Sequence, residues 1–411
     1  MHATSLKQRS RWLRDAVAHA TRQGVNAQWA ASLICAVTSL GLSVLLARLM
    51  SPAAFGNYAF YLGVGAAMGI ALDGGLRTLL LRERAAPTPA LALPPQAMVA
   101  AMLGHLLVVT PLLLGAWAWR HDGTAATAAL CFAAITLTLW YSAWLKGSGA
   151  LHREARWQLL CRFSSAAAIL LGLWLFGPRA DVVFLGWTLG LAVAGLIAWP
   201  RRQWRATLPT RTLYRSSLSF AGVDLATLIY HRADIVLLYA LQDDLAEVGR
   251  YAAAYRLYDG ILLLTAPLAL ILFRRMRQSA GGATGRRLEA LAMGVAMAAG
   301  AVLAAGAGLL GTPLAGLLFG AAFTQAHLIG WLFCALIAAL PNAVLTYWAI
   351  AHHQERFYAL SAAAAALVNL ALNAWLIPHY GALGAAWSTM AAEGVLGGLL
   401  FGCWWGGGGG D

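Results

Sequence analysis

The sequence from Ala27 to Ala47 reads AQWAASLICAVTSLGLSVLLA, an apolar run without a charged side chain. About 20 such residues are enough for an α-helix to cross the ~30 Å hydrocarbon core of a bilayer. Similar runs recur along the chain, and we count twelve candidate spans. They are 27–47, 58–81, 96–119, 124–145, 157–177, 181–199, 216–240, 248–273, 288–310, 326–351, 357–377 and 380–404. The sequence therefore predicts an all-α polytopic membrane protein.

The composition supports this prediction. Of the 411 residues, 60% are hydrophobic and 11% are charged, whereas a typical soluble domain carries about 25% charged residues. This chain has too little charge to cover a water-facing surface. The connections between the spans are too short for a soluble domain, and the five cysteines lie in or beside apolar runs, which indicates small packing residues.

The positions of the basic residues predict the orientation. The chain carries 29 Lys and Arg and a net charge of +13, which is also typical of nucleic-acid-binding proteins. With the N-terminus inside, however, most of these residues fall on inner segments, as the positive-inside rule requires. The outer segments hold only Arg48, Arg120, Arg179 and Arg250. We therefore expect both termini in the cytoplasm and no nucleic-acid partner.

A weak internal repeat divides the chain. The sequences LLARL (45–49) and FGNYA (55–59) are echoed by LLYAL (237–241) and VGRYA (248–252), and LWLFGP (173–178) is echoed by AWLIP (374–378). Six spans separate the echoes, so both halves have one orientation, which is typical of lobes related by a pseudo-two-fold axis along the membrane normal. Chance similarity between apolar segments is the alternative.

The repeat gives the expected domain organisation. A basic cytoplasmic segment (1–26), either an interfacial helix or a solvated tail, precedes a six-helix N-lobe (27–200). A basic cytoplasmic loop (201–215) leads to a six-helix C-lobe (216–404), and a Gly-rich tail (405–411) ends the chain.

Charged residues within the spans are the candidates for function, because each is costly in hydrocarbon without a partner. Asp73 and Arg77 are four residues apart and predict either an internal ion pair or a substrate contact. Asp224 and His231 share a helical face. Asp234 and Arg256 lie at comparable depth in neighbouring spans, so we expect them to pair or to share one cavity, with an inert salt bridge as the alternative; Asp259 lies in the same span as Arg256.

Further polar residues lie in the last two spans. Glu393 has no basic residue in reach along its own helix, which makes it, with Asp224, a candidate for proton coupling; the alternative is a basic partner on another helix. Asn369 and Asn373 are one turn apart and predict either hydrogen bonds between helices or sugar-binding amides. No catalytic motif and no set of metal ligands occurs in the sequence, so we expect no enzyme activity, cofactor or metal.

Several short motifs resemble a known family. These are LARLMSP (46–52), FGNY (55–58), DGGL (73–76), RAD (232–234), VGRYAAAYRL (248–257), NLALN (369–373), IPHYG (377–381) and GAA (384–386). In order and spacing they are similar to bacterial polysaccharide biosynthesis membrane proteins. That family comprises the O-antigen and exopolysaccharide flippases of the superfamily that includes the MATE drug exporters.

The resemblance implies a flippase of the bacterial inner membrane. Its substrate would be an undecaprenyl-pyrophosphate-linked oligosaccharide, moved by alternating access through a central cavity. Arg77, Arg232 and Arg256 would be the cavity cations, with Arg162 a weaker candidate, and Asp73, His231, Asn369 and Asn373 would complete the substrate site. Asp224, Asp234, Asp259 and Glu393 would serve coupling or ion pairing. We expect a monomer that works beside a glycan polymerase and co-polymerase.

Two other functions fit a chain of this kind. A MATE-like exporter of small cationic compounds would have an acidic cavity lining. A membrane glycan polymerase or ligase would need a sizeable outer loop with catalytic basic residues, and the predicted outer loops are too short for one.

Overall fold

The computed structural model describes residues 24–86, 94–198, 206–279, 283–325 and 327–406. Within these ranges the chain is helical and contains no strand, which confirms the predicted all-α fold. Most of the N-terminal basic segment, the first part of the inter-lobe loop (Arg201, Arg202 and Arg205) and the glycine run 407–410 lie outside the described residues.

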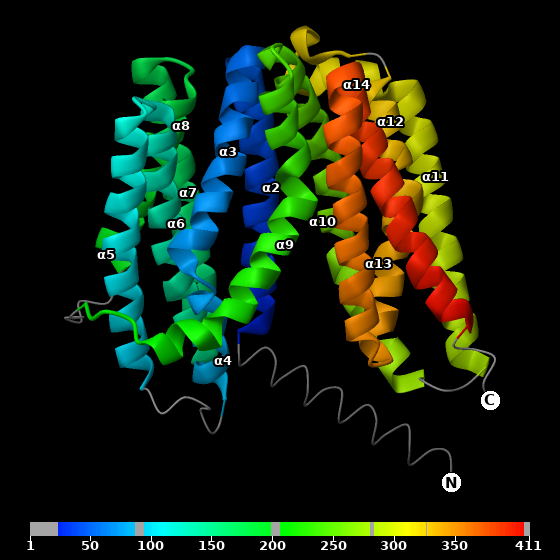
Figure 1. Ribbon diagram of the computed structural model, residues 1–411, viewed down its shortest axis with the longest axis horizontal. Helices are drawn as coiled ribbons and strands as arrows, with labels where there is room; N and C mark the ends of the chain where they lie inside the picture. Colours follow the sequence, from blue (N-terminus) through cyan, green and yellow to red (C-terminus); the bar gives the residue numbers. More distant parts are fainter. Residues whose placement is uncertain (1–23, 87–93, 199–205, 280–282, 326, 407–411) are drawn as a thin grey trace. The chain divides into compact units, whose positions relative to one another are not determined.

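Helices follow one another with short connections (Figure 1). In chain order they are α2 (Val25–Leu49), α3 (Pro52–Asp73), α4 (Leu76–Ala85), α5 (Pro95–Trp119), α6 (Gly123–Gly147), α7 (Leu151–Phe176), α8 (Ala180–Ala198), α9 (Arg211–Leu241), α10 (Leu245–Ser279), α11 (Ala283–Phe319), the 3-10 turn η1 (Ala321–Phe323), α12 (Leu328–Cys334), α13 (Leu336–Ala351) and α14 (Glu355–Gly406).

In the described ranges, nine helical segments are long and apolar enough to cross a membrane. The last of them, Arg356–Gly406, contains two predicted spans, which meet at a non-helical residue, Gly381. The predicted spans 216–240 and 248–273 lie in α9 and α10, which are helical along these stretches but are not among the nine. These two helices carry Arg232, Asp234, Arg256 and Asp259, so the candidate site itself makes them less apolar.

Packing divides the chain into two compact units. Unit 1 comprises Met1–Leu42 and Val64–Leu225, and unit 2 comprises Ser43–Gly63 and Ala226–Asp411. The divisions fall inside α2, α3 and α9. These units are therefore a different division from the two sequence repeats, and the repeat-based boundaries at 200 and 216 stay a prediction.

A helix break in unit 1 corrects the predicted span 58–81. Gly74 and Gly75 have φ angles of 57° and 72°, a left-handed conformation that glycine adopts at little cost but that ends a right-handed helix. Asp73 therefore ends α3, and α4 begins at Leu76. The break also allows α9 to approach, because a Cβ on Gly75 would lie 2.6 Å from the backbone nitrogen of Ala221.

The neighbourhood of this break is firmly packed. Buried side chains of α4, α5, α6 and α9 form one apolar cluster that includes Leu80, Met102 and Trp140. His105 of α5 joins two of its neighbours, with Nδ1 2.7 Å from Tyr214 Oη and Nε2 2.9 Å from the carbonyl oxygen of Ala71. Helices α5, α6, α7 and α8 run side by side in this unit (Figure 1).

In unit 2 the helices α3 and α10 cross at two glycines. Gly56 and Gly249 occupy equivalent places in the echoed sequences FGNYA and VGRYA. A Cβ on Gly56 would lie 2.8 Å from the backbone nitrogen of Gly249, and a Cβ on Gly249 would collide with the carbonyl oxygen of Pro52. Backbone on both sides leaves no flexible side chain that could move aside, so this crossing requires glycine.

We predict that Gly249→Val destabilises the protein, because the new side chain forces the two backbones apart. Overpacking of this kind costs about 1–3 kcal/mol. The matched control is Gly294→Ala in α11, where a Cβ meets nothing within 4 Å. Thermal unfolding in detergent should show a lower midpoint for the Gly249 variant than for the wild type and the control. Equal midpoints for all three proteins would contradict the packing described above.

Candidate functional site

Glu393 of α14 lies in unit 2 among neutral hydrogen-bond donors from three other helices. Tyr230 Oη of α9 donates to Glu393 Oε1 at 2.7 Å, and Asn342 Nδ2 of α13 donates to Oε2 at 2.8 Å. Tyr258 Oη of α10 approaches Oε1 at 3.5 Å. Glu393 is 7% exposed, and no described cation forms an ion pair with it. The alternative prediction, that Glu393 pairs with a basic residue of another helix, is therefore wrong within the described residues.

Two other predicted site residues lie close to this carboxylate. His231 and Asn369 line a small pocket together with Tyr255, Thr389 and Glu393. Its volume is about 10 Å³, roughly the space of one water molecule. The structure thus brings together His231, Asn369 and Glu393, which the sequence places in three different predicted spans.

Asn369 and Asn373 bond to each other within α14. Asn373 Nδ2 donates to Asn369 Oδ1 at 2.9 Å, and both side chains are buried. Asn373 Oδ1 is buried without a hydrogen-bond partner. The hydrogen bond that joins the two amides is therefore internal to one helix and does not connect two helices.

Asp234 and Arg256 do not form an ion pair, which corrects one half of the prediction; that they share one cavity stays a prediction. Asp234 Oδ2 accepts a hydrogen bond from Tyr251 Oη, and Oδ1 accepts one from the backbone nitrogen of Ile235 at 2.8 Å. Neither Asp234 nor Arg256 lines the small pocket beside Glu393. Arg256 follows Tyr251 by five residues, which is about 140° around a helix. It therefore lies on a different side of α10 from the residue that contacts Asp234.

Two arginines of unit 2 differ in their charge compensation. Arg232 Nη2 lies 3.9 Å from Asp259 Oδ2, with both side chains partly exposed. Arg256 is half-buried, and Arg232 and Asp259 are among its electrostatic neighbours. Among the described residues Arg256 forms no ion pair of its own. Arg232 and Arg256 are thus both near Asp259, and the buried Asp234 is a further electrostatic neighbour of Arg232.

In unit 1 the helix break separates the side chains of Asp73 and Arg77. Asp73 Oδ1 accepts hydrogen bonds from Trp140 Nε1 at 2.5 Å and from the backbone nitrogen of Arg77 at 3.3 Å. The Arg77 guanidinium instead lies 4.0 Å from Asp224 Oδ2 of α9. The predicted Asp73–Arg77 ion pair is wrong, because residues four apart face each other only in a continuous helix.

The residues that sequence reasoning missed are mostly aromatic donors. Trp140, Tyr230, Tyr251 and Tyr258 each contact one of the buried carboxylates. One signal was present in the sequence: Tyr251, Tyr255 and Tyr258 recur at the spacing of one helical face. Their rings lie in a row, with centroids 5.8 and 5.5 Å apart.

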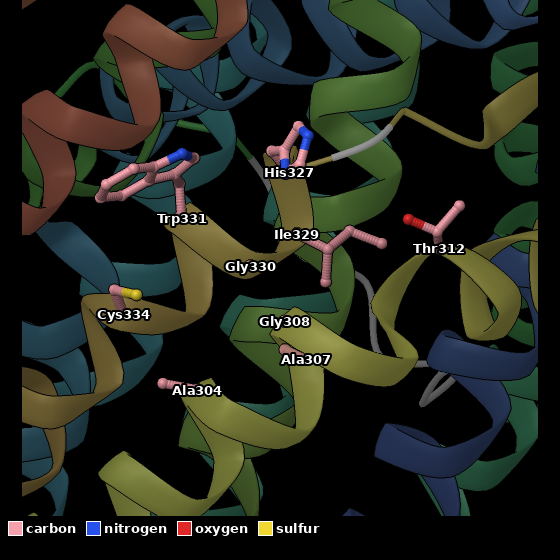
Figure 2. A pocket seen from close by; sticks show the side chains of 9 residues that line it. All are labelled: Ala304, Ala307, Gly308, Thr312, His327, Ile329, Gly330, Trp331 and Cys334. Carbon is pink, nitrogen blue, oxygen red and sulfur yellow. The ribbon is translucent and has the colours of Figure 1, made fainter.

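A second pocket lies between α11 and α12, with a volume of about 240 Å³. Figure 2 shows its two sides: Ala304, Ala307 and Gly308 of α11 face the short helix that carries Trp331. The small residues of α11 leave the space open. None of the predicted site residues lines this pocket, and its polar groups, which include His327 and Thr312, are too few to indicate a ligand.

Comparisons with known proteins identify solved structures of similar fold. No protein-family model and no protein of curated function matches the sequence. Among solved structures, the inward-closed lipid II flippase MurJ matches with a TM-score of 0.70 and 11% identity, over 92% of this chain and 87% of that one. The chain has the fold of MOP-superfamily transporters.

Two MATE transporters have the same fold. An inward-facing multidrug resistance MATE transporter of the MOP superfamily matches with a TM-score of 0.68 and 13% identity, over 90% of this chain and 93% of that one. A MATE transporter from Vibrio cholerae matches with a TM-score of 0.53 and 13% identity, over 95% and 97%. These matches confirm the predicted fold class, an all-α membrane fold of two lobes.

Proposed function

We propose that this chain is a flippase for an undecaprenyl-pyrophosphate-linked oligosaccharide, such as an O-antigen or exopolysaccharide repeat unit. It would move this substrate from the cytoplasmic to the outer leaflet by alternating access. A polar glycan headgroup cannot cross about 30 Å of hydrocarbon unaided. The order of the family motifs and a fold shared with a lipid II flippase support the proposal. We expect a monomer in the inner membrane with both termini in the cytoplasm.

One observation carries this proposal: Arg256 lies within a predicted span, half-buried, without an ion pair among the described residues. An intramembrane cation is costly without a partner. Asp259, an electrostatic neighbour of Arg256, lies 3.9 Å from Arg232. A pyrophosphate can supply the ion-pair partner that Arg256 lacks, and arginine is well suited to bind it because its guanidinium donates several hydrogen bonds in one plane.

The carboxylates argue against the exporter of cationic compounds. Such a transporter needs acidic groups that are free to bind a cation. In the described residues Asp73, Asp234 and Glu393 already accept hydrogen bonds from aromatic or amide donors. Asp224 and Asp259 each lie beside an arginine. The acidic groups of the spans therefore already have a hydrogen-bond or ion-pair partner, whereas Arg256 has no ion pair among the described residues.

We predict that Arg256→Gln greatly lowers the export of the glycan. Losing a hydrogen bond to a charged group costs about 1.5–3 kcal/mol, which corresponds to a roughly tenfold or larger loss of binding. The matched control is Arg250→Gln on the same helix, since Arg250 already pairs with Asp244 at 3.1 Å. Surface polysaccharide is measured in cells whose own copy of the gene is deleted. Normal polysaccharide from the Arg256 variant, at normal membrane abundance, would overturn the proposal.

Glu393 is our candidate for coupling transport to a proton gradient. Its three neutral donors can hold the carboxylate without an arginine, so a proton can bind or leave without stranding a buried cation. We predict that Glu393→Gln removes the response of flipping to an imposed pH gradient in liposomes. The control Glu289→Gln changes another buried glutamate, which accepts a hydrogen bond from Trp404 at 2.9 Å. A Glu393 variant with the wild-type gradient response would exclude this role.

A further inference from the structure

Unit 1 contains a pocket that the proposed function does not use. It lies between α2, α6, α7 and α8, with a volume of about 240 Å³. Its lining includes Cys35, Leu139, Ser142, Lys146, Gln158 and Arg162. Leu139 is 40% exposed, so the pocket opens to the surface of this unit. A space of this size holds a phosphate group together with several waters.

Arg162 is the distinctive group of this pocket. It is half-buried in α7, and no described residue forms an ion pair with it. Its polar neighbour is the thiol of Cys35, which is a weak acceptor. The apolar part of α7 begins at Trp157, so Arg162 lies about 8 Å into the predicted span at 1.5 Å per residue. A cation at this depth needs a compensating anion.

The other charges near the pocket compensate each other. Lys146 Nζ lies 3.3 Å from Glu154 Oε1, which also accepts hydrogen bonds from Ser142 Oγ at 2.7 Å and from Gln158 Nε2. Glu154 is fully buried and is not part of the lining. Lys146 and Glu154 therefore form a neutral pair at the edge, and Arg162 gives the pocket one net positive charge.

We propose that this pocket binds the phosphodiester group of an anionic glycerophospholipid. One negative charge on the phosphodiester matches the one uncompensated arginine, and a guanidinium is a strong phosphate donor. The pocket lies towards the end of unit 1 where α6 ends and α7 begins, with α2 beside it. The charge distribution predicts this end to be cytoplasmic, so the lipid belongs to the inner leaflet.

The apolar side chains around the opening suit the acyl chains. Leu139 of α6, which lines the pocket, is 40% exposed, and Ile34, which precedes the lining residue Cys35 in α2, is 43% exposed. A headgroup in the pocket can therefore leave its hydrocarbon tails on a surface that is already apolar. This site is independent of the flippase proposal, because it requires only that unit 1 lies in a bilayer.

The test is lipid retention by the purified full-length protein. The protein in detergent is equilibrated with equimolar phosphatidylglycerol and phosphatidylcholine, and bound lipids are counted by native mass spectrometry. We expect the wild type to retain phosphatidylglycerol preferentially. Arg162→Gln should reduce that preference roughly tenfold, or about 1.4 kcal/mol. The control Arg156→Gln removes an exposed arginine from the same helix and should keep the preference.

A second variant separates binding from folding. Leu139→Trp narrows the opening and keeps Arg162, so it should also reduce the retention of phosphatidylglycerol. If Arg162→Gln aggregates in size-exclusion chromatography, the lipid retention of Leu139→Trp tests the site in its place. Equal retention of both lipids by the wild type, or unchanged preference in both variants, would overturn the site.

A competition arm identifies the source of the phosphate. Undecaprenyl pyrophosphate is added at the same concentration as phosphatidylglycerol. We expect phosphatidylglycerol to stay bound. If undecaprenyl pyrophosphate displaces all phosphatidylglycerol from the wild type, and does not bind to the Arg162 variant, the phospholipid assignment is wrong. The pocket would then bind the phosphate of a lipid-linked substrate.

Discussion

A charge inside a lipid bilayer needs a partner, and this constraint explains most of the polar structure of the chain. Within the described residues, every carboxylate of the predicted spans has a donor or a cation beside it. Aromatic side chains supply many of these donors, as Trp140 does for Asp73 and Tyr251 does for Asp234. The arginines differ, because Arg162 and Arg256 have no ion pair there. An arginine without an ion pair among the described residues is thus the feature on which both functional proposals depend.

Glycine residues determine where two helices can approach each other closely. The left-handed pair Gly74–Gly75 ends α3 and allows α9 to lie against the break, which brings Asp224 to Arg77. The contact of Gly56 with Gly249 joins α3 to α10 at residues that correspond in the two sequence repeats. At both places a side chain would keep the backbones apart. The contact between Arg77 and Asp224 is therefore a consequence of a backbone conformation that favours glycine.

The sequence was sufficient for the fold class and for most of the spans, because apolar length is a property of a single segment. It was insufficient for the pairing of charges. The depth of Asp234 and Arg256 could be counted from their shared loop, but their directions around the helices could not, and Tyr251 occupies the place expected for the arginine. Asp73 and Arg77 were predicted to pair on a helix that in fact breaks between them. The donors of Glu393 lie 51 to 163 residues away in the chain, beyond the reach of any local pattern.

The central claim is that Arg256, which has no ion pair among the described residues, binds an anionic lipid-linked substrate. The most direct measurement uses the wild-type protein in liposomes with two labelled cargoes. One is a fluorescent undecaprenyl-pyrophosphate oligosaccharide, whose access to an impermeant quencher reports its leaflet; the other is a small cationic dye, whose uptake is followed by fluorescence. We predict that the protein moves the oligosaccharide lipid between leaflets and leaves the dye distribution as in protein-free liposomes. Transport of the dye without movement of the oligosaccharide lipid would contradict the account.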